Sequence, residues 1–122
     1  MDNLVVLDCE VYPNYFLVAF KNIDNHKVIT IEAKGEDTTL TPEDHKLLHT
    51  VMAKRKTFGF NSRNYDLPII LYALTKKTCK QIHELSDSII ENNLQGWQSM
   101  KMHNLQIPRD YFHFDISEPS PG

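Results

Sequence analysis

The sequence has few of the features that mark several common protein classes. Its two cysteines, Cys9 and Cys79, form no CxxC motif, so neither a disulfide framework nor a zinc site is expected and both are interpreted as reduced packing residues. The 13 lysines and arginines do not outnumber the 16 aspartates and glutamates, and the formal charge is −3. No overall basic field therefore marks a nucleic-acid-binding protein, and any such binding must be local.

Long apolar runs are also missing. No segment approaches the roughly 20 apolar residues of a membrane-spanning helix, and the N-terminal MDNLVVLDCE is acidic where a signal peptide is basic. A cytoplasmic protein without a membrane partner is therefore expected. With 122 residues, 41% of them hydrophobic, the chain can bury one core but not two, so residues 1–122 are expected to form a single domain.

The beginning of the chain is typical of a β-meander. Residues 4–12, 15–22 and 26–33 are rich in Val, Ile, Phe and Tyr, and the turn-forming PN and IDN separate them. This pattern predicts three consecutive antiparallel strands.

Helical and strand-like patterns alternate after the meander. Thr41 as N-cap, with Pro42 in the first turn, predicts a helix within residues 39–56. Residues 93–108 show no clear period and are expected to form a loop in which Trp97 anchors on the core. In a nuclease this segment could instead border the channel for the DNA strand, with Lys101 and Arg109 as the nearest basic residues for backbone contacts. Further strands are predicted over 56–61 and 110–117, and further helices over 66–77 and 78–93. The order predicts an α/β fold with a mixed sheet of about five strands and flanking helices.

Two carboxylates, Asp8 and Glu10, interrupt the apolar run of the first predicted strand. Side chains alternate along a strand, so these two point to the same face, roughly 6–7 Å apart. The apolar residues around them are typical of a central strand covered on both faces. Burying unpaired carboxylates is costly, and no lysine or arginine lies within residues 1–20. A distant basic residue, solvent at the strand's end or a divalent metal ion would each resolve the conflict.

A second polar group lies in FGFNSRNYDLPII, residues 58–70. Asn61 and Asp66 fall between a predicted strand and a predicted helix, where ligands tend to bind in open α/β sheets. Free backbone N–H groups at the helix start and the side chain of Arg63 add to this potential. The same residue types also serve as helix caps and turn formers.

Together, LDCE and FNSRNYD resemble the first two motifs of the DEDD superfamily of 3′–5′ exonucleases. The longer stretches LDCEVYPNYFLVAFKN and GFNSRNYDLPIILYAL resemble the N-terminal exonuclease regions attached to DNA polymerases of bacteriophages. The resemblance implies a ribonuclease-H-like fold and a proofreading-type, metal-dependent 3′–5′ exonuclease that acts on single-stranded or frayed DNA 3′ ends.

The resemblance also assigns metal ligands. In the superfamily, acidic residues hold two divalent cations, and carboxylates suit Mg²⁺ or Mn²⁺ because these ions prefer hard oxygen ligands. Asp8 would bridge both ions, Glu10 would hold one and help orient the attacking water, and Asp66 would bind the second.

Other residues are candidates for substrate binding. By the same resemblance, Asn61 would hold the terminal nucleotide or a metal-bound water, with Arg63 beside it. Tyr12, Tyr15 and Phe16 could stack on a terminal base, as aromatic residues do in single-strand binders, although most aromatic residues in a strand pair fill a core. Tyr65 could stack too, although packing in the core is the favoured interpretation.

The third motif of the superfamily, Tyr or His followed by Asp on a last helix, is not matched. Tyr111 and Asp115 have its literal spacing, but they lie in a predicted strand, where residues four apart are roughly 13 Å distant. Asp115 instead resembles an acidic residue common on the fifth strand of the superfamily, and by that resemblance it could approach the metal face. The chain is expected to lack the last helix, as a fragment or as a short relative, and to digest DNA slowly or not at all.

These expectations extend to partners and location. A covalently linked polymerase domain, or a second copy covering the surface left by the missing helix, would be the protein partner. The location would be the host cytoplasm if the gene belongs to a phage. The alternative is a non-catalytic module of the same fold that binds nucleic acid or protein through an incomplete acidic site.

Overall fold

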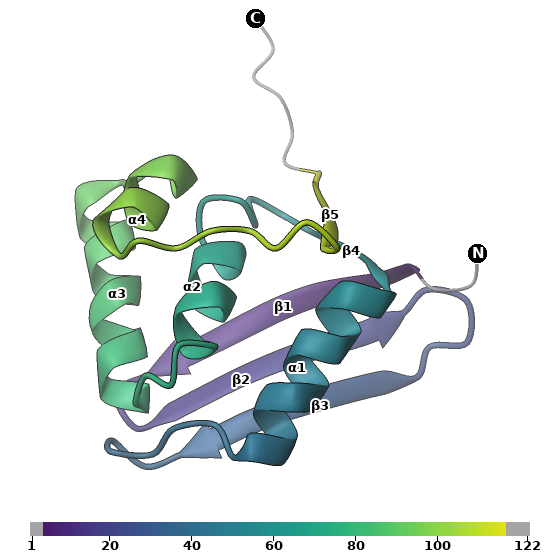
Figure 1. Ribbon diagram of the computed structural model, residues 1–122, viewed down its shortest axis with the longest axis horizontal. Coiled ribbons are helices and arrows are strands. Elements are labelled where there is room, and N and C mark those ends of the chain that lie inside the picture. Colours follow the sequence, from purple (N-terminus) through teal and green to yellow (C-terminus); the bar gives the residue numbers. More distant parts are fainter. Residues whose placement is uncertain (1–3, 117–122) are drawn as a thin grey trace, which may run out of the picture.

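The computed structural model describes residues 4–116 and shows an α/β fold (Figure 1). Within this range there are five strands, which form one mixed sheet, and four helices. The strands are β1 (Leu4–Tyr12), β2 (Tyr15–Asn22), β3 (Val28–Lys34), β4 (Lys56–Gly59) and β5 (Phe112–Asp115). The helices are α1 (Pro42–Lys54), α2 (Asp66–Ala73), α3 (Cys79–Asn92) and α4 (Gly96–Met102). Helix α4 packs on α2. The predicted α/β fold class and five-stranded mixed sheet are confirmed. Residues 1–3 and 117–122, which the predicted single domain over 1–122 includes, lie outside the described range.

The sheet has the strand order β3-β2-β1-β4-β5. β1, β2 and β3 are antiparallel neighbours, as the predicted meander requires, and Tyr12 pairs with Tyr15 across the first hairpin. β4 runs parallel to β1 but pairs with it only over Leu4–Val6, and β5 runs parallel to β4. The carboxyl ends of β1, β4 and β5 therefore point the same way, and β1 loses its β4 partner before it ends.

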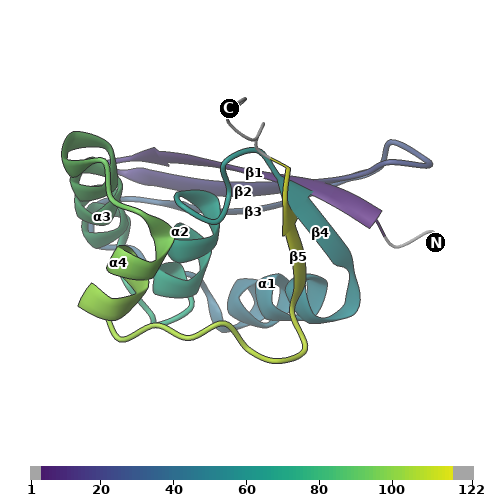
Figure 2. The same cartoon turned by 90° about the horizontal axis from the view of Figure 1, so that it is seen from above.

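All four helices lie on one face of the sheet (Figure 2). Along β1, Val5, Leu7 and Cys9 are buried toward the helices, whereas Asp8 and Glu10 are exposed on the other face. The expectation that β1 is covered on both faces is thus wrong for the described chain. Apolar residues on the outer face of a strand do not reveal whether anything packs over them. Both carboxylates are exposed, so solvent reaches them on this face.

The core lies between the helices and the inner face of the sheet. Phe16, Val18 and Phe20 of β2 are almost completely buried, and nearly every side chain of α2 is buried as well. Such an all-round apolar helix is stable only inside a protein. Cys9 and Cys79 are buried free thiols, which confirms their interpretation as packing residues. No helix in residues 4–116 is long and apolar enough to cross a membrane.

Local capping begins the helices where the sequence predicts. The Thr41 hydroxyl accepts a hydrogen bond from the Asp44 N–H (3.1 Å), and Thr78 forms a reciprocal capping box with Gln81. The predicted loop over 93–108 is wrong in part, because it contains α4. Trp97 does not anchor on the core either, since 67% of it is exposed. A seven-residue helix is too short to show a helical period in the sequence.

Candidate active site

The candidate site forms where β4 leaves β1. After Gly59 the chain turns through residues 60–65, with Asn61 in a left-handed conformation (φ 54°), and enters α2 at Asp66. The Arg63 N–H donates a hydrogen bond to Asp115 Oδ2 (3.1 Å) at the end of β5. This loop, called the 60–65 loop below, is therefore held against β5 as it delivers Asp66 to the edge of β1.

Asp66 takes the place of a missing strand partner. Its Oδ2 accepts a hydrogen bond from the Cys9 N–H (3.1 Å), at a point on β1 that β4 no longer reaches. The Asp66 side chain is buried, with 7% of the residue exposed. Because Cys9 separates Asp8 from Glu10 in the chain, this bond brings Asp66 beside the predicted Asp-x-Glu motif.

The environment of Asp66 disfavours its ionised form. Burial, and next the negative charge of Asp8, raise the pKa of Asp66 to about 7. Hydrogen bonds from the backbone N–H groups of Cys9 and Asp66 act in the opposite direction, and the charge of Asp115 raises the pKa further. Burial, Asp66 and Asp8 also raise the pKa of the Cys9 thiol. Asp8, Asp66 and Asp115 thus come from three elements and share one electrostatic environment.

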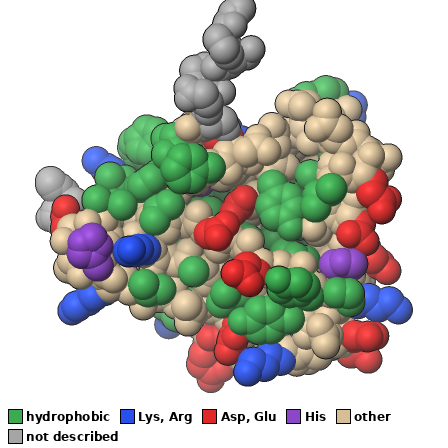
Figure 3. Space-filling model, turned by 180° about the vertical axis from the view of Figure 1, so that it is seen from behind, with side chains coloured by type: hydrophobic (Ala, Val, Ile, Leu, Met, Phe, Trp, Pro, Cys, Tyr) green, Lys and Arg blue, Asp and Glu red, His purple; other side chains and the backbone are tan. Residues whose placement is uncertain are grey.

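Glu10 and Tyr12 lie further along the exposed side of β1. Glu10 is not among the charges that raise the pKa of Asp66; it contributes instead, as a lesser cause, to the raised pKa of Tyr15. Tyr12 is exposed, and its ring lies 6.3 Å from that of Tyr15. On this face of the molecule, hydrophobic side chains flank a few acidic ones near the middle (Figure 3).

The other predicted substrate residues lie on or beside the 60–65 loop. Asn61 is exposed and its Oδ1 accepts a hydrogen bond from Asn64 Nδ2 (3.1 Å). Arg63 turns toward β5, where its Nη2 donates to the His113 carbonyl (3.1 Å). Tyr65 packs against the core, and its hydroxyl hydrogen-bonds to Ser86 Oγ (2.6 Å). The contacts of Tyr65 are therefore those of a packing residue.

Sequence reasoning missed a buried hydrogen-bond network behind the loop. The His113 ring bridges two hydroxyls, with Nδ1 2.7 Å from Thr57 Oγ1 and Nε2 2.7 Å from Ser62 Oγ. Thr57 and Ser62 are fully buried and His113 nearly so. Burial, and then the Arg63 charge, lower the pKa of His113 to about 4. A neutral imidazole has one donor and one acceptor, so it can satisfy both hydroxyls. The alternating pattern FHFD gave no signal for it, because alternation places the two phenylalanines rather than His113 on the inner face, whereas the structure buries His113.

A second missed contact joins α4 to the loop. The Gly96 N–H donates to Asn64 Oδ1 (2.7 Å), and a Cβ on Gly96 would overlap the carbonyl oxygen of Arg63. Only a glycine permits this close approach. The start of α4 is therefore fixed directly to the segment that carries Arg63 and Asp66.

Gly96→Ala is expected to lower the free energy of unfolding by about 1–3 kcal/mol, because the added methyl group must displace a packed backbone. Urea unfolding monitored by circular dichroism measures the change. Met102→Ala, at an exposed position of the same helix, is the matched control and should have little effect. Equal stability of the Gly96→Ala variant and the wild type would contradict the tight junction.

The donor chemistry of the acidic residues fits a hard divalent cation, although the carboxylates are not gathered into a ready-made site. In the described part of the chain, no three His, Cys, Asp or Glu side chains are grouped so that they could hold a metal ion. Over the same residues, Asp8, Glu10 and Asp66 form no ion pair with a lysine or arginine. A buried carboxylate without a cationic partner, beside a second carboxylate, is a site where a divalent cation would relieve repulsion.

The chain matches no protein-family model, no curated protein and no solved structure.

Proposed function

We propose that this chain is a DEDD-type, ribonuclease-H-like exonuclease domain that removes nucleotides from single-stranded DNA 3′ ends with Mg²⁺ or Mn²⁺. The observation that carries the proposal is the position of Asp66. Asp66 lies 57 positions from Cys9 in the sequence, yet its carboxylate accepts a hydrogen bond from the Cys9 N–H, next to Asp8. This contact lies at the carboxyl ends of the parallel strands, where ligands bind in open α/β sheets. The element order of the described chain, a meander, a helix and a strand ending in the second motif, agrees with the resemblance.

The residues have distinct roles in this proposal. Asp8 and Asp66 would hold the cations, with Glu10 completing the set from the same face of β1. Such ions lower the pKa of a bound water and stabilise the oxygen that leaves a phosphodiester. The Cys9 N–H fixes the orientation of the Asp66 carboxylate, and the Arg63 N–H fixes that of Asp115. Both carboxylates are thus positioned by backbone donors before any ligand arrives.

A metal-linked increase in stability tests the proposal. Millimolar Mn²⁺ is expected to raise the melting temperature of the wild type by about 5 °C, because a ligand that binds only the folded state stabilises it. Asp8→Asn and Asp66→Asn should abolish the rise. Asp24→Asn, at an exposed acid in the turn between β2 and β3, is the matched control and should keep it. An identical response in wild type and Asp8→Asn would contradict the proposal.

Digestion of DNA distinguishes the enzyme from a binding module. A 5′-labelled oligonucleotide incubated with the protein and Mn²⁺ should shorten slowly from its 3′ end, and Asp8→Ala should stop this. Binding of the oligonucleotide with no Mn²⁺ response and no shortening would refute the exonuclease proposal and favour the non-catalytic alternative.

A further inference from the structure

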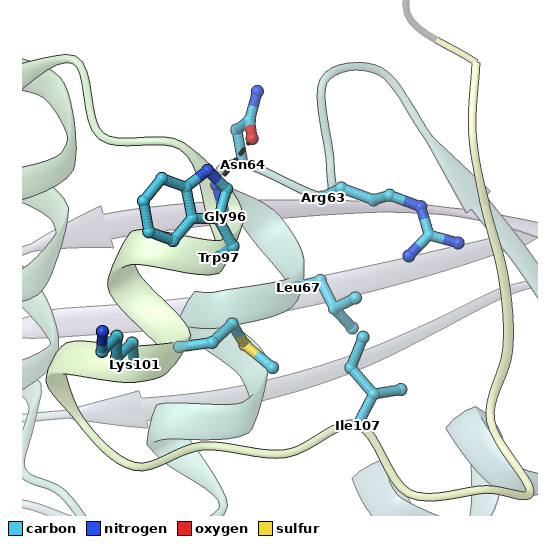
Figure 4. Close-up of a pocket in the computed structure, with 8 residues that line it drawn as sticks. Arg63, Asn64, Leu67, Gly96, Trp97, Lys101 and Ile107 are labelled. Carbon is cyan, nitrogen blue, oxygen red and sulfur yellow. Dashed lines mark hydrogen bonds between the residues drawn. The ribbon is translucent and has the colours of Figure 1, made fainter.

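A cleft opens on the helix side of the molecule, beside the 60–65 loop (Figure 4). Its volume is about 590 Å³, within the usual range of sites for small organic groups. Arg63 and Trp97 stand on opposite sides of it, with Leu67 and Ile107 between them. Leu67 is almost fully buried. The cleft thus has an apolar floor, one aromatic wall and one cationic wall.

Trp97 is unusually accessible for so large an apolar side chain, with 67% of its surface exposed. The same residue also lines a second hollow of about 390 Å³, together with Leu94 and Met102. The indole therefore contributes to the lining of both hollows, where a flat group can pack against its exposed surface. Burying this exposed ring would be favourable for any planar ligand.

The charge around the cleft is positive, in contrast to the chain as a whole. Arg63 and Lys101 line it, and no Asp or Glu is among its lining residues in the described chain. The protein carries a net charge of −3, so this combination is local. Cations placed beside an exposed aromatic ring are typical of surfaces that bind single-stranded nucleic acid, with phosphates at the cations and bases on the ring.

Arg63 connects the cleft to the acidic site. Its N–H holds Asp115, its Nη2 donates to the His113 carbonyl and its side chain lines the side of the cleft opposite Trp97, leaving its other guanidinium N–H groups to bind a phosphate. The loop that carries it ends at Asp66, and α4 is fixed to the same loop through Gly96 and Asn64. The cleft and the acidic residues are therefore parts of one rigid junction.

We propose that the Trp97 cleft binds bases of the single-stranded DNA whose 3′ end lies at the acidic site, with Lys101 and Arg63 contacting its phosphates. This inference rests on the proposed exonuclease function. It adds a binding site on α4 that lies outside the two motifs of the resemblance.

Fluorescence offers a direct test, because Trp97 is the one tryptophan of the sequence. Titration of the wild type with oligo(dT) of about eight nucleotides, in EDTA to prevent cleavage, should quench the emission of Trp97. Added salt should weaken the binding, since phosphate contacts are salt-dependent. The absence of quenching at saturating oligonucleotide would overturn the proposal.

Variants then measure the contribution of each wall by the anisotropy of the labelled oligonucleotide. Trp97→Leu should weaken binding by about 5- to 100-fold, and Lys101→Gln should weaken it and reduce its dependence on salt. The controls are Phe112→Leu, at an exposed aromatic residue of β5, and Lys80→Gln, at an exposed lysine of α3. Both should bind as the wild type does.

The outcomes separate the two proposals. Wild-type affinity in Trp97→Leu, with the Asp8-dependent Mn²⁺ response intact, would overturn the cleft alone. Trp97-dependent binding by a wild type that shows no Mn²⁺ response and no digestion would refute the exonuclease and leave the cleft as a DNA-binding site.

Discussion

Replacing Asp66 with asparagine is expected to raise the free energy of unfolding at pH 8 by as much as about 4 kcal/mol. The pKa of Asp66 is about 7 in the folded chain, against an ordinary value of 3.8, because the carboxyl group is buried beside Asp8. Ionising it at high pH therefore destabilises the folded state. Asparagine carries no charge and can still accept the hydrogen bond from the Cys9 N–H through its side-chain oxygen.

The sign of the effect fixes its pH window. The folded protein keeps the Asp66 proton up to pH about 7, whereas the unfolded chain releases it near pH 4. The stabilisation by protonated Asp66 is thus complete below about pH 4. It decreases as the pH rises from about 4 and is fully lost once the pH has passed about 7. The difference between Asp66→Asn and the wild type should grow across this window and then stay constant.

His113 has the opposite dependence. Its pKa falls from an ordinary 6.5 to about 4 in the folded chain, so its contribution to stability is complete above pH 6.5 and is lost as the pH falls toward 4. Between about pH 4 and 6.5, the effect of Asp66 on the free energy of unfolding of the wild type therefore offsets that of His113. Asp66→Asn removes one of them and should reveal an acid-induced loss of up to about 3 kcal/mol.

Urea unfolding at several pH values between about 4 and 8 measures both effects. Asp24→Asn, which removes an exposed acid from the β2–β3 turn, is the control for a simple change of net charge. Stability curves of Asp66→Asn and the wild type that run parallel across the whole range would contradict the assignment of a raised pKa to Asp66.

The second large effect is expected from His113→Leu, which should lower the free energy of unfolding by about 2–4 kcal/mol at pH 7. Leucine fills a similar volume but leaves the buried hydroxyls of Thr57 and Ser62 without the ring nitrogens that bind them. Ser62 also belongs to the 60–65 loop, so the loop should loosen where it carries Asp66. Thermal and urea unfolding give the magnitude.

A triple variant provides the matched control for this prediction. Thr57→Val and Ser62→Ala, added to His113→Leu, remove the two hydroxyls that lose their imidazole partner in the single variant, where Thr57 Oγ1 keeps only its longer bond to the Phe112 carbonyl (3.4 Å). Replacing every partner of a buried hydrogen bond by apolar groups is often nearly neutral, so the triple variant should recover most of the lost stability. A His113→Leu variant as stable as the wild type would show that the network contributes nothing.

Much of the fold follows from local patterns in the sequence. Runs of β-branched and aromatic residues separated by PN and IDN predict the meander, and Thr41 and Thr78 lie where α1 and α3 begin. The helix α4 was missed because it is short and is stabilised by its docking on Asn64. The sequence predicted that other elements pack on both faces of β1, which is wrong, because the helices cover only one face of the sheet. Apolar residues occur on both faces of β1, so the sequence pattern does not distinguish the covered face from the open one.

The sequence by itself determined that Asp8 and Glu10 share one face of a strand, since alternation along a strand is a local property. The tertiary structure alone decided that Asp66 and Asp115 join Asp8. That convergence depends on the parallel pairing of β1, β4 and β5 and on the early separation of β4 from β1. It also decided that Asp66 is the buried carboxylate and Asp8 the exposed one, because burial is a property of packing between segments far apart in the chain.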